Sequence, residues 1–202
     1  MVTAVVNKRK SHRSRNPHPR PQTPQRELDL RRPTSVRQTV IMLFLIGIFI
    51  LHISAIVLLL VATIDNAWWV TDTMRTDIWA RWNLINGVWN HTDLPTGSDY
   101  PQDYLQAVQA TSVLACIFSI IAALVFLAQL FTLPKGQRFT IAGAFQLLAC
   151  LFIMIAASIY TNRFHVKESQ GNYGHSYILA WIAFGLTFFS SITYFVLRKK
   201  SA

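Results

Sequence analysis

The side chains that most often carry chemistry in proteins are few in this sequence and lie far apart. Its two cysteines, Cys116 and Cys150, both fall inside apolar runs, and the acidic residues of the loops are dispersed. His91 stands alone among them, so the loops offer no Ser/His/Asp or Cys/His arrangement for nucleophilic catalysis and no cluster of metal ligands. We therefore expect no enzymatic activity, no cofactor and no metal site.

Strongly polar side chains inside the apolar runs form a second group of candidates. A charged residue in the hydrocarbon of a membrane is costly and usually marks a transport pathway. The runs contain one imidazole, His52, and three amides, Gln109, Gln129 and Gln146. One weakly basic group and three glutamines favour interhelical hydrogen bonds, which is our interpretation; a proton relay is the alternative.

Two short motifs point to covalent modification and to sorting. Asn90 begins the sequence Asn-His-Thr, an acceptor for N-linked glycosylation that the expected topology places on the luminal side. Lys199 and Lys200 lie fourth and third from the carboxyl end, as a dilysine retrieval signal for the endoplasmic reticulum requires. We favour the alternative, a basic cluster that stops the last apolar run.

Membrane-spanning helices must position these residues. Of the 202 residues 52% are hydrophobic and only 14% are charged, whereas soluble domains carry about 25% charged residues. Four uncharged stretches are each long enough to cross the ~30 Å hydrocarbon core of a bilayer. We predict spans at residues 40–64, 107–133, 139–160 and 177–197. Small residues scattered along them predict an all-α membrane protein, a compact four-transmembrane-helix bundle.

Positive charge is concentrated at the amino end. Residues 1–39 contain ten of the nineteen Lys and Arg residues against two acidic ones, so they carry +8 of the net +10. Five of the eight prolines also lie there, and this composition predicts a disordered cytosolic tail that binds anionic lipid. A nucleic-acid-binding arm, a nuclear address and a mitochondrial transit peptide are the alternatives.

The remaining basic residues predict the orientation in the membrane. Lys135 and Arg138 lie between the second and third spans, and residues 198–200 form a basic cluster after the fourth. Because Lys and Arg accumulate on the cytosolic side, both termini are predicted to be cytosolic. The tetraspan domain then comprises residues 40–200, and its first outer loop comprises residues 65–106.

The first outer loop is rich in tryptophan. β-Branched, aromatic and polar residues alternate around residues 69–79 and 82–89, a pattern that predicts short strands. We expect a small extracellular antiparallel β-sheet over the helix ends. The side chains expected to pack on this sheet, or to anchor it at the membrane interface, are Trp68, Trp69, Trp79, Trp82 and Trp89. A binding role for them is the alternative.

Several ordered blocks of the sequence resemble one family. They include Ile64-Asp65-Asn66-Ala67-Trp68-Trp69-Val70 and two longer blocks at residues 154–161 and 176–184. Over residues 42–200 the chain resembles the epithelial membrane proteins and peripheral myelin protein, within the claudin superfamily. The resemblance implies a claudin-like fold, with four transmembrane helices and a small extracellular sheet.

The resemblance also implies a function. Members of this family are non-enzymatic tetraspan membrane proteins that organise membrane microdomains. They influence the trafficking, adhesion and surface abundance of partner membrane proteins such as integrins and raft or caveolar components. We accordingly expect a plasma-membrane protein that passes through the endoplasmic reticulum and Golgi and can form a homo-oligomer. A claudin-like cell–cell junction or paracellular barrier protein is the first alternative, and a channel is the second.

Two features depart from the family's pattern. Family members begin near the position of Met42, so the resemblance says nothing about residues 1–41. The family's outer loop carries a disulfide, but the two cysteine positions read Trp82 and Trp89 here. A bridge worth about 2–4 kcal/mol is then absent, and we expect packing of Trp82 against Trp89 to replace it in a looser sheet.

Overall fold

Four long helices dominate the fold. The computed structural model describes residues 24–98, 100–132, 140–166, 168 and 170–201. The helices are α1 (Pro24–Ile64), α2 (Gln102–Thr132), α3 (Thr140–Arg163) and α4 (His175–Ser201). Each contains 22 or more consecutive residues that are apolar enough to cross a membrane. This finding confirms the predicted tetraspan fold class.

The helices extend beyond the apolar runs that predicted them. α2 begins five residues before the predicted start, and α3 continues to Arg163 rather than ending at residue 160. A helix does not stop where the hydrocarbon stops, because its backbone hydrogen bonds continue into polar sequence until a capping or breaking residue intervenes.

The amino-terminal segment differs from expectation. The chain divides into two units, residues 1–42 and 43–202. In the first unit residues 24–39, for which composition predicts disorder, are helical. Their Gln, Arg, Glu and Leu residues have good helix propensity, Pro24 is tolerated in a first turn, and the adjoining span removes the cost of nucleation. The rest of the predicted tail, residues 1–23, lies outside the described residues.

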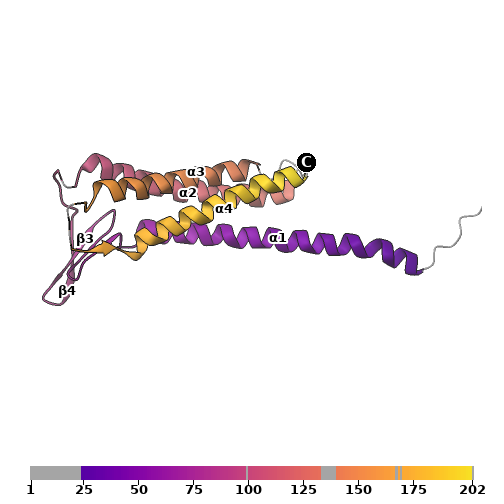
Figure 1. The fold of residues 1–202 in the computed structure, drawn as a ribbon, viewed down its shortest axis with the longest axis horizontal. Coiled ribbons are helices and arrows are strands. Elements are labelled where there is room, and N and C mark those ends of the chain that lie inside the picture. Colours follow the sequence, from indigo (N-terminus) through magenta and orange to yellow (C-terminus); the bar gives the residue numbers. More distant parts are fainter. Residues whose placement is uncertain (1–23, 99, 133–139, 167, 169, 202) are drawn as a thin grey trace, which may run out of the picture. The chain divides into compact units, whose positions relative to one another are not determined.

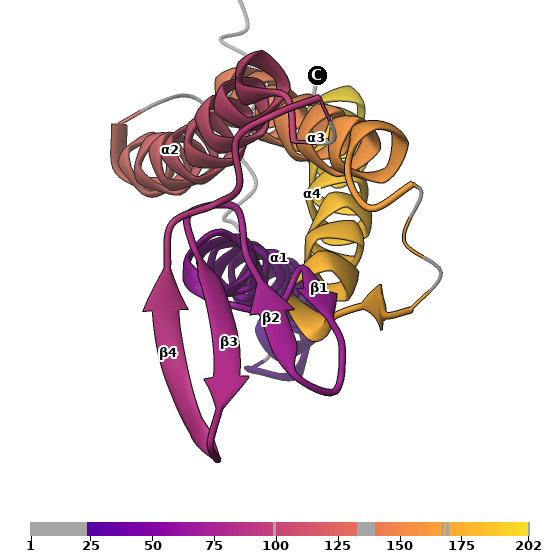
Figure 2. The same ribbon diagram turned by 90° about the vertical axis from the view of Figure 1, so that its left-hand side faces the viewer.

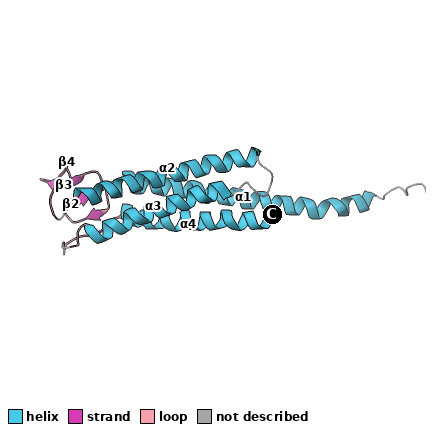
Figure 3. Cartoon of the chain, turned by 90° about the horizontal axis from the view of Figure 1, so that it is seen from above, coloured by secondary structure: helices cyan, strands magenta, loops and turns pink. Residues whose placement is uncertain are grey.

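In the second unit the helices follow one another around the bundle in the order α1, α2, α3, α4 (Figure 2). Seen from above they run side by side, with the strands gathered at one end (Figure 3). The backbones of α3 and α4 approach closely at Gly143, where an added methyl group would lie 3.0 Å from Cβ of Tyr194. A small residue is therefore favoured at this crossing.

A five-stranded antiparallel sheet lies at one end of the bundle (Figure 1). Four strands come from the segment between α1 and α2: β1 (Trp69–Val70), β2 (Met74–Thr76), β3 (Arg81–Ile85) and β4 (Val88–Thr92). The fifth, β5 (Asn172–Tyr173), comes from the segment between α3 and α4. The spatial order is β4-β3-β2-β1-β5. The predicted antiparallel sheet is thus confirmed, and β5 is an addition to it.

The hairpin of β3 and β4 has the local sequence that its geometry needs. Asn86 and Gly87 join the strands, and both have positive φ angles, 53° and 79°. A two-residue turn with both central residues in this region matches the right-handed twist of the strands, and Asn-Gly is its preferred sequence. The register that follows pairs Trp82 with His91 and Leu84 with Trp89.

The main apolar core lies beneath the sheet and between the nearby helix ends. It contains fully buried side chains from α1, the β segment, α2 and α3, among them Leu59, Trp68, Ile78, Val108 and Tyr160. The core therefore joins the sheet to the bundle, and the polar side chains at this junction are the ones to consider for function.

Candidate functional site

Two tryptophans of the β segment cap the carboxyl end of α1. The indole N–H of Trp68 donates to the carbonyl of Ala62 over 2.7 Å, and that of Trp79 donates to the carbonyl of Thr63 over 2.7 Å. Because α1 ends at Ile64, the carbonyls of its last turn lack helical partners. The two indoles supply them, which fixes the first strand relative to the helix.

Trp68 is also the central ring of an aromatic cluster. It is fully buried, and it meets the rings of Tyr160 and Tyr177 edge to face at centroid distances of 4.8 and 6.0 Å. Tyr177 in turn exchanges a hydrogen bond of 2.7 Å with the hydroxyl of Thr161. One side chain of the β segment thereby contacts both α3 and α4.

The turn before β3 is held by an internal carboxylate and by α2. Asp77 accepts hydrogen bonds from the backbone N–H groups of Trp79 and Ala80, each at 2.5 Å. Burial raises the pKa of Asp77, and these two N–H donors only partly oppose that effect. The amide of Gln109 donates to the carbonyl of Ile78 over 2.7 Å. Gln109 therefore binds the outer segment, whereas the sequence predicted an interhelical contact.

A histidine that sequence reasoning did not select lies at the centre of the junction. His165 follows α3, yet its side chain has no exposed surface. Its Nδ1 lies 2.9 Å from a carboxylate oxygen of Glu168, and its Nε2 lies 3.1 Å from the hydroxyl of Tyr160 and 3.5 Å from that of Tyr100. The imidazole thus joins groups from three segments.

Trp69 of β1 completes this arrangement. Its ring stacks on the imidazole of His165 with a centroid distance of 4.6 Å and an interplanar angle of 8°. The indole N–H of Trp69 is buried and has no hydrogen-bond partner among the residues that the structure describes. Gly171 approaches it so closely that a methyl group at that position would lie 2.6 Å from the indole nitrogen. Trp69 is a packing residue between the two outer segments.

The start of α4 is joined to the end of α1 by polar contacts. Asp65 forms an ion pair with His175 and accepts a hydrogen bond from the hydroxyl of Ser176 at 3.3 Å. Burial raises the pKa of Asp65, but hydrogen bonds from His175, from the backbone and from Ser176 outweigh it, so the net pKa lies below the usual value. The pair is an ion pair only while His175 is protonated.

The other two outer tryptophans do not pack as the sequence predicts. The ring of Trp82 meets that of His91 edge to face at 5.1 Å, and the guanidinium of Arg75 lies 4.8 Å from the centre of the Trp89 ring. Trp82 and Trp89 share one face of the hairpin, but the register places each opposite another residue. The expected ring pair is therefore replaced by one histidine contact and one cation–π contact.

The polar side chains within the spans lie between helices, with His52 the best connected. Its Nε2 is 3.0 Å from the carbonyl of Ser119, and its Nδ1 is 2.8 Å from the hydroxyl of Tyr194. Because the carbonyl can only accept, Nε2 carries the hydrogen and Nδ1 accepts from Tyr194. This histidine links α1 to α2 and α4.

The two remaining glutamines are buried but less fully bonded. The carbonyl oxygen of Gln146 accepts a hydrogen bond of 3.2 Å from the hydroxyl of Ser119, which links α3 to α2. The Nε2 of Gln146 and the Oε1 of Gln129 have no hydrogen-bond partner among the described residues. The interhelical hydrogen bond predicted for the Gln129 side chain therefore does not involve its carbonyl oxygen within the described part of the chain.

The candidate glycosylation residue lies on the surface. Asn90 is exposed in β4, the outermost strand, where its amide donates to the carbonyl of Val88 at 3.1 Å. An exposed edge position is compatible with glycan attachment. The side chains of Lys199 and Lys200 lie outside the described residues.

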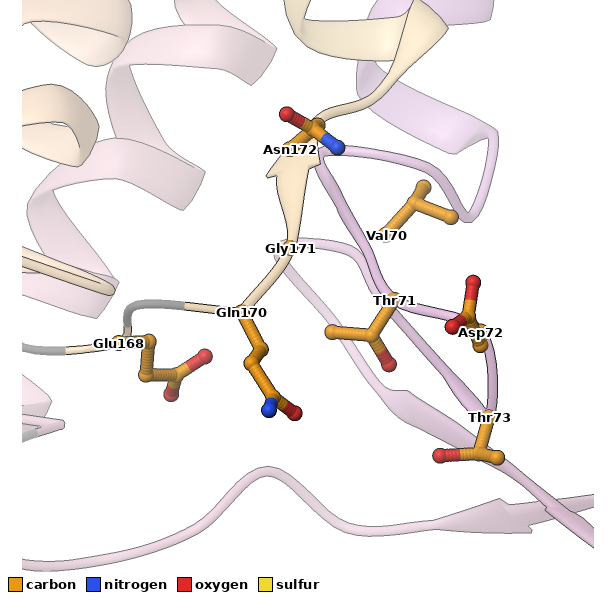
Figure 4. A pocket seen from close by; sticks show the side chains of 8 residues that line it. All are labelled: Val70, Thr71, Asp72, Thr73, Glu168, Gln170, Gly171 and Asn172. Atoms are coloured by element: carbon orange, nitrogen blue, oxygen red, sulfur yellow. The ribbon is translucent and has the colours of Figure 1, made fainter.

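An open cleft lies between the turn joining β1 to β2 and the segment before β5 (Figure 4). Asp72 and Glu168 contribute carboxylates to its polar lining. In the part of the chain that the structure describes, no three His, Cys, Asp or Glu side chains gather as metal ligands.

The turn between β3 and β4 could have been predicted from the sequence. Asn86-Gly87 between two aromatic-rich segments is a strong hairpin signal and would have placed the register of β3 and β4. No such sequence signal marks His165, Tyr100 and Glu168. They come together only because two separate segments of the chain meet in the folded structure.

Four apolar helices with a sheet clamped to one end by buried aromatic rings define a multi-pass membrane protein of the tetraspan class. The sequence model of the PMP-22/EMP/MP20/Claudin family matches residues 41–194. The chain therefore belongs to this family.

Individual relatives agree with the family assignment. Epithelial membrane protein 2 of Bos taurus is 44% identical over 165 residues, which are 76% of this chain and 95% of that protein. Epithelial membrane protein 2 of Homo sapiens is 42% identical over 161 residues, 74% of this chain and 93% of the relative. Epithelial membrane protein 1 of Homo sapiens is 39% identical over 164 residues, 79% of this chain and 99% of the relative.

Proposed function

We propose that this protein is a non-enzymatic organiser of membranes, which packs beside partner membrane proteins and influences their trafficking, adhesion and surface abundance. The family match over residues 41–194 carries this proposal. The plasma membrane is the proposed site of action, with integrins and raft or caveolar components as the proposed partner class. A homo-oligomer is a further proposed assembly.

The outward face of α1 supports lateral association. In the most apolar stretch of α1 only 22% of the residues are buried in the fold, against 44% in the corresponding stretch of α3. Ile46, Ile50 and Val57 are each more than half exposed and recur at helical spacing. A span that gives little of its surface to its own bundle leaves most of it for lipid or for a second protein.

Proximity labelling from the carboxyl end in intact cells tests the proposal. We expect integrins among the labelled proteins, and changed integrin abundance at the surface when the protein is expressed. Exchanging Ile46, Ile50 and Val57 for leucine preserves hydropathy but alters shape, and should reduce that labelling. The matched control exchanges the exposed residues Leu148, Leu151 and Ile155 of α3 for valine.

Two results would contradict the proposal. One is a labelled set equal to that of an unrelated four-span protein of the same abundance. The other is unaltered integrin abundance at the surface. Equal loss from the α1 and α3 exchanges would leave the function intact but remove α1 as its docking face.

The uncovered edge of the sheet favours one second candidate, a cell–cell junction protein. β4 is an edge strand with the sequence Val-Trp-Asn-His-Thr, without proline or a formal charge, and four of its five residues are exposed. Edges of this kind pair readily with another strand. Continuous intramembrane strands in freeze-fracture images of expressing cells would support a junction protein over the organiser.

The proposed topology places both termini in the cytosol and the sheet outside. Four spans put the termini on one side, and the basic residues near both ends favour the cytosolic side. The basic tail is proposed to bind anionic lipid at about 1 kcal/mol per basic residue near the surface. Deleting residues 1–39 should weaken binding to anionic liposomes at low salt; unchanged binding would remove this part of the proposal.

A further inference from the structure

The side chain of His165 occupies a closed site between the sheet and the helix ends. The ring of Trp69 stacks on one face of the imidazole, and the rings of Tyr100 and Tyr160 lie with their centroids 5.7 Å from its centre. Its backbone has a φ of +58°, in the left-handed region that few residues other than glycine adopt and in which Asn, Asp and His are enriched. The chain accepts this conformation at the point where it turns the imidazole inward.

The hydrogen bonds define the protonation state that fits this site. The carboxylate of Glu168 can only accept, so Nδ1 of His165 carries the hydrogen of their 2.9 Å contact. Nε2 then accepts from the hydroxyl of Tyr160 at 3.1 Å. An added proton would turn Nε2 into a donor, and the existing bond from Tyr160 would be lost or reversed.

The charged groups around the imidazole do not make a good site for a cation. Within the described part of the chain, Glu168 is the one carboxylate in contact with the imidazole, and 42% of its side-chain surface is exposed to solvent. Arg81 of β3 is a like charge, whose guanidinium lies 5.8 Å from the centre of the Tyr100 ring. The charge of Asp77 influences the hydroxyl groups of Tyr100 and Tyr160, and it has no resolved electrostatic effect on His165.

The balance of these effects has a direction. Burial lowers the pKa of His165, Glu168 opposes this, and Arg81 lowers the pKa further, so the net pKa lies below its usual value. Burial also raises the pKa of Tyr100, which therefore stays a neutral hydroxyl throughout the physiological range.

We propose that His165, held between Trp69, Tyr160 and Glu168, is an acid-sensitive clasp that fastens the sheet to the bundle and releases it when the imidazole takes up a proton. The clasp is independent of the function proposed above. It would make the state of the outer face depend on the pH of the compartment that the protein occupies.

The sign follows from proton linkage. The released state binds a proton on His165 with the ordinary pKa of about 6.5, and the clasped state binds it only at lower pH. Stability of the clasped state is therefore complete above about pH 6.5 and falls as the pH drops below it. Between the two pKa values, each unit by which the pH falls raises the ratio of released to clasped protein about tenfold.

His175 lies outside the clasp. Its side chain is largely exposed and pairs with Asp65, which ties the start of α4 to the end of α1 through a separate contact.

The reporter for release is Thr76, which is fully buried and pairs with Trp69 across β1 and β2. Thr76→Cys in the full chain, in detergent micelles, is titrated with 4,4′-dithiodipyridine, which stays reactive in acid. Ser98→Cys, at an exposed position, supplies the reference rate. The ratio of the two rates cancels the pH dependence of the reagent. We expect it to rise roughly threefold or more between pH 7.5 and pH 5.0.

His165→Asn supplies a clasp that cannot be charged. Asparagine accepts the left-handed backbone and can still donate an N–H to Glu168. With this variant the ratio should stay flat across the titration, whereas His175→Gln should retain the acid response. A flat ratio in the parent chain, or an unaltered acid response with His165→Asn, would overturn the proposal.

A further variant decides the matter if His165→Asn does not fold. Glu168→Gln removes the carboxylate that stabilises the charged imidazole in the clasped state, so proton uptake favours release more strongly and the midpoint of release should move to higher pH. A midpoint that stays in place would equally overturn the proposal.

Discussion

Replacing Trp68 by phenylalanine should destabilise the fold far more than the same replacement at Trp79, although both indoles cap α1. The Trp68 ring is fully buried, so its loss leaves the Ala62 carbonyl without a donor and without water. An unsatisfied buried acceptor costs about 1–3 kcal/mol. The smaller ring leaves part of the site empty, which adds about 1 kcal/mol. The expected loss for Trp68→Phe is therefore about 2–4 kcal/mol.

The expected loss of stability for Trp79→Phe is smaller. Its side chain is 47% exposed, so water can reach the Thr63 carbonyl when the indole N–H is removed. A hydrogen bond exchanged for one to water contributes about 0.5–1.5 kcal/mol. Trp89→Phe, which removes no hydrogen bond to the bundle, serves as the control and should cost less still.

The assay is the free energy of unfolding in mixed micelles, from a titration with sodium dodecyl sulfate followed by far-ultraviolet circular dichroism. The reasoning fails if the two cap variants lose equal free energy, or if Trp68→Phe costs less than about 1 kcal/mol. In either case the indole hydrogen bond would contribute little, and the cluster would depend on ring packing alone.

Three further outcomes are expected. A double-mutant cycle of His52→Phe and Tyr194→Phe should give a coupling of about 0.6–1.7 kcal/mol by the same micelle titration, and additive losses would deny the 2.8 Å contact an energetic role. Gly174→Ala should prevent surface expression, because its methyl group would lie 2.2 Å from a backbone oxygen, whereas Gly87→Ala, which meets open space, should only strain its turn; flow cytometry of a tagged chain that found both equally expressed would contradict this. Asn90→Gln should increase electrophoretic mobility by one N-glycan, as glycosidase treatment of the parent does, and unaltered mobility would exclude glycosylation there.

The membrane helices could be predicted because their signal is local. Each span is a continuous apolar run, and its length alone selects a helix in hydrocarbon. The boundaries were less predictable, since α2 begins in polar sequence and residues 24–39 are helical despite their charge. Composition indicates which solvent a segment prefers, but backbone hydrogen bonding determines where its helix ends.

The junction was predictable only in part. Of the loop tryptophans singled out for packing, Trp68 and Trp69 are buried, whereas Trp79 and Trp89 are exposed. Their partners depended on register, and a hairpin that pairs Trp82 with His91 could not be distinguished from one that pairs it with Trp89 without placing the Asn86-Gly87 turn. The role of His165 could not be predicted from the sequence, because Trp69 and Tyr100, which contact it, are far away along the chain.

The hairpin of β3 and β4 is held by ring contacts and backbone pairing, where the family pattern has a covalent bridge. Both cysteines of the chain are free thiols, Cys116 and Cys150, buried inside the bundle. Maturation of the outer face thus needs no oxidant and no isomerase to select the right bond. The stability of this hairpin therefore depends on temperature and solvent and is independent of the redox state of the surroundings.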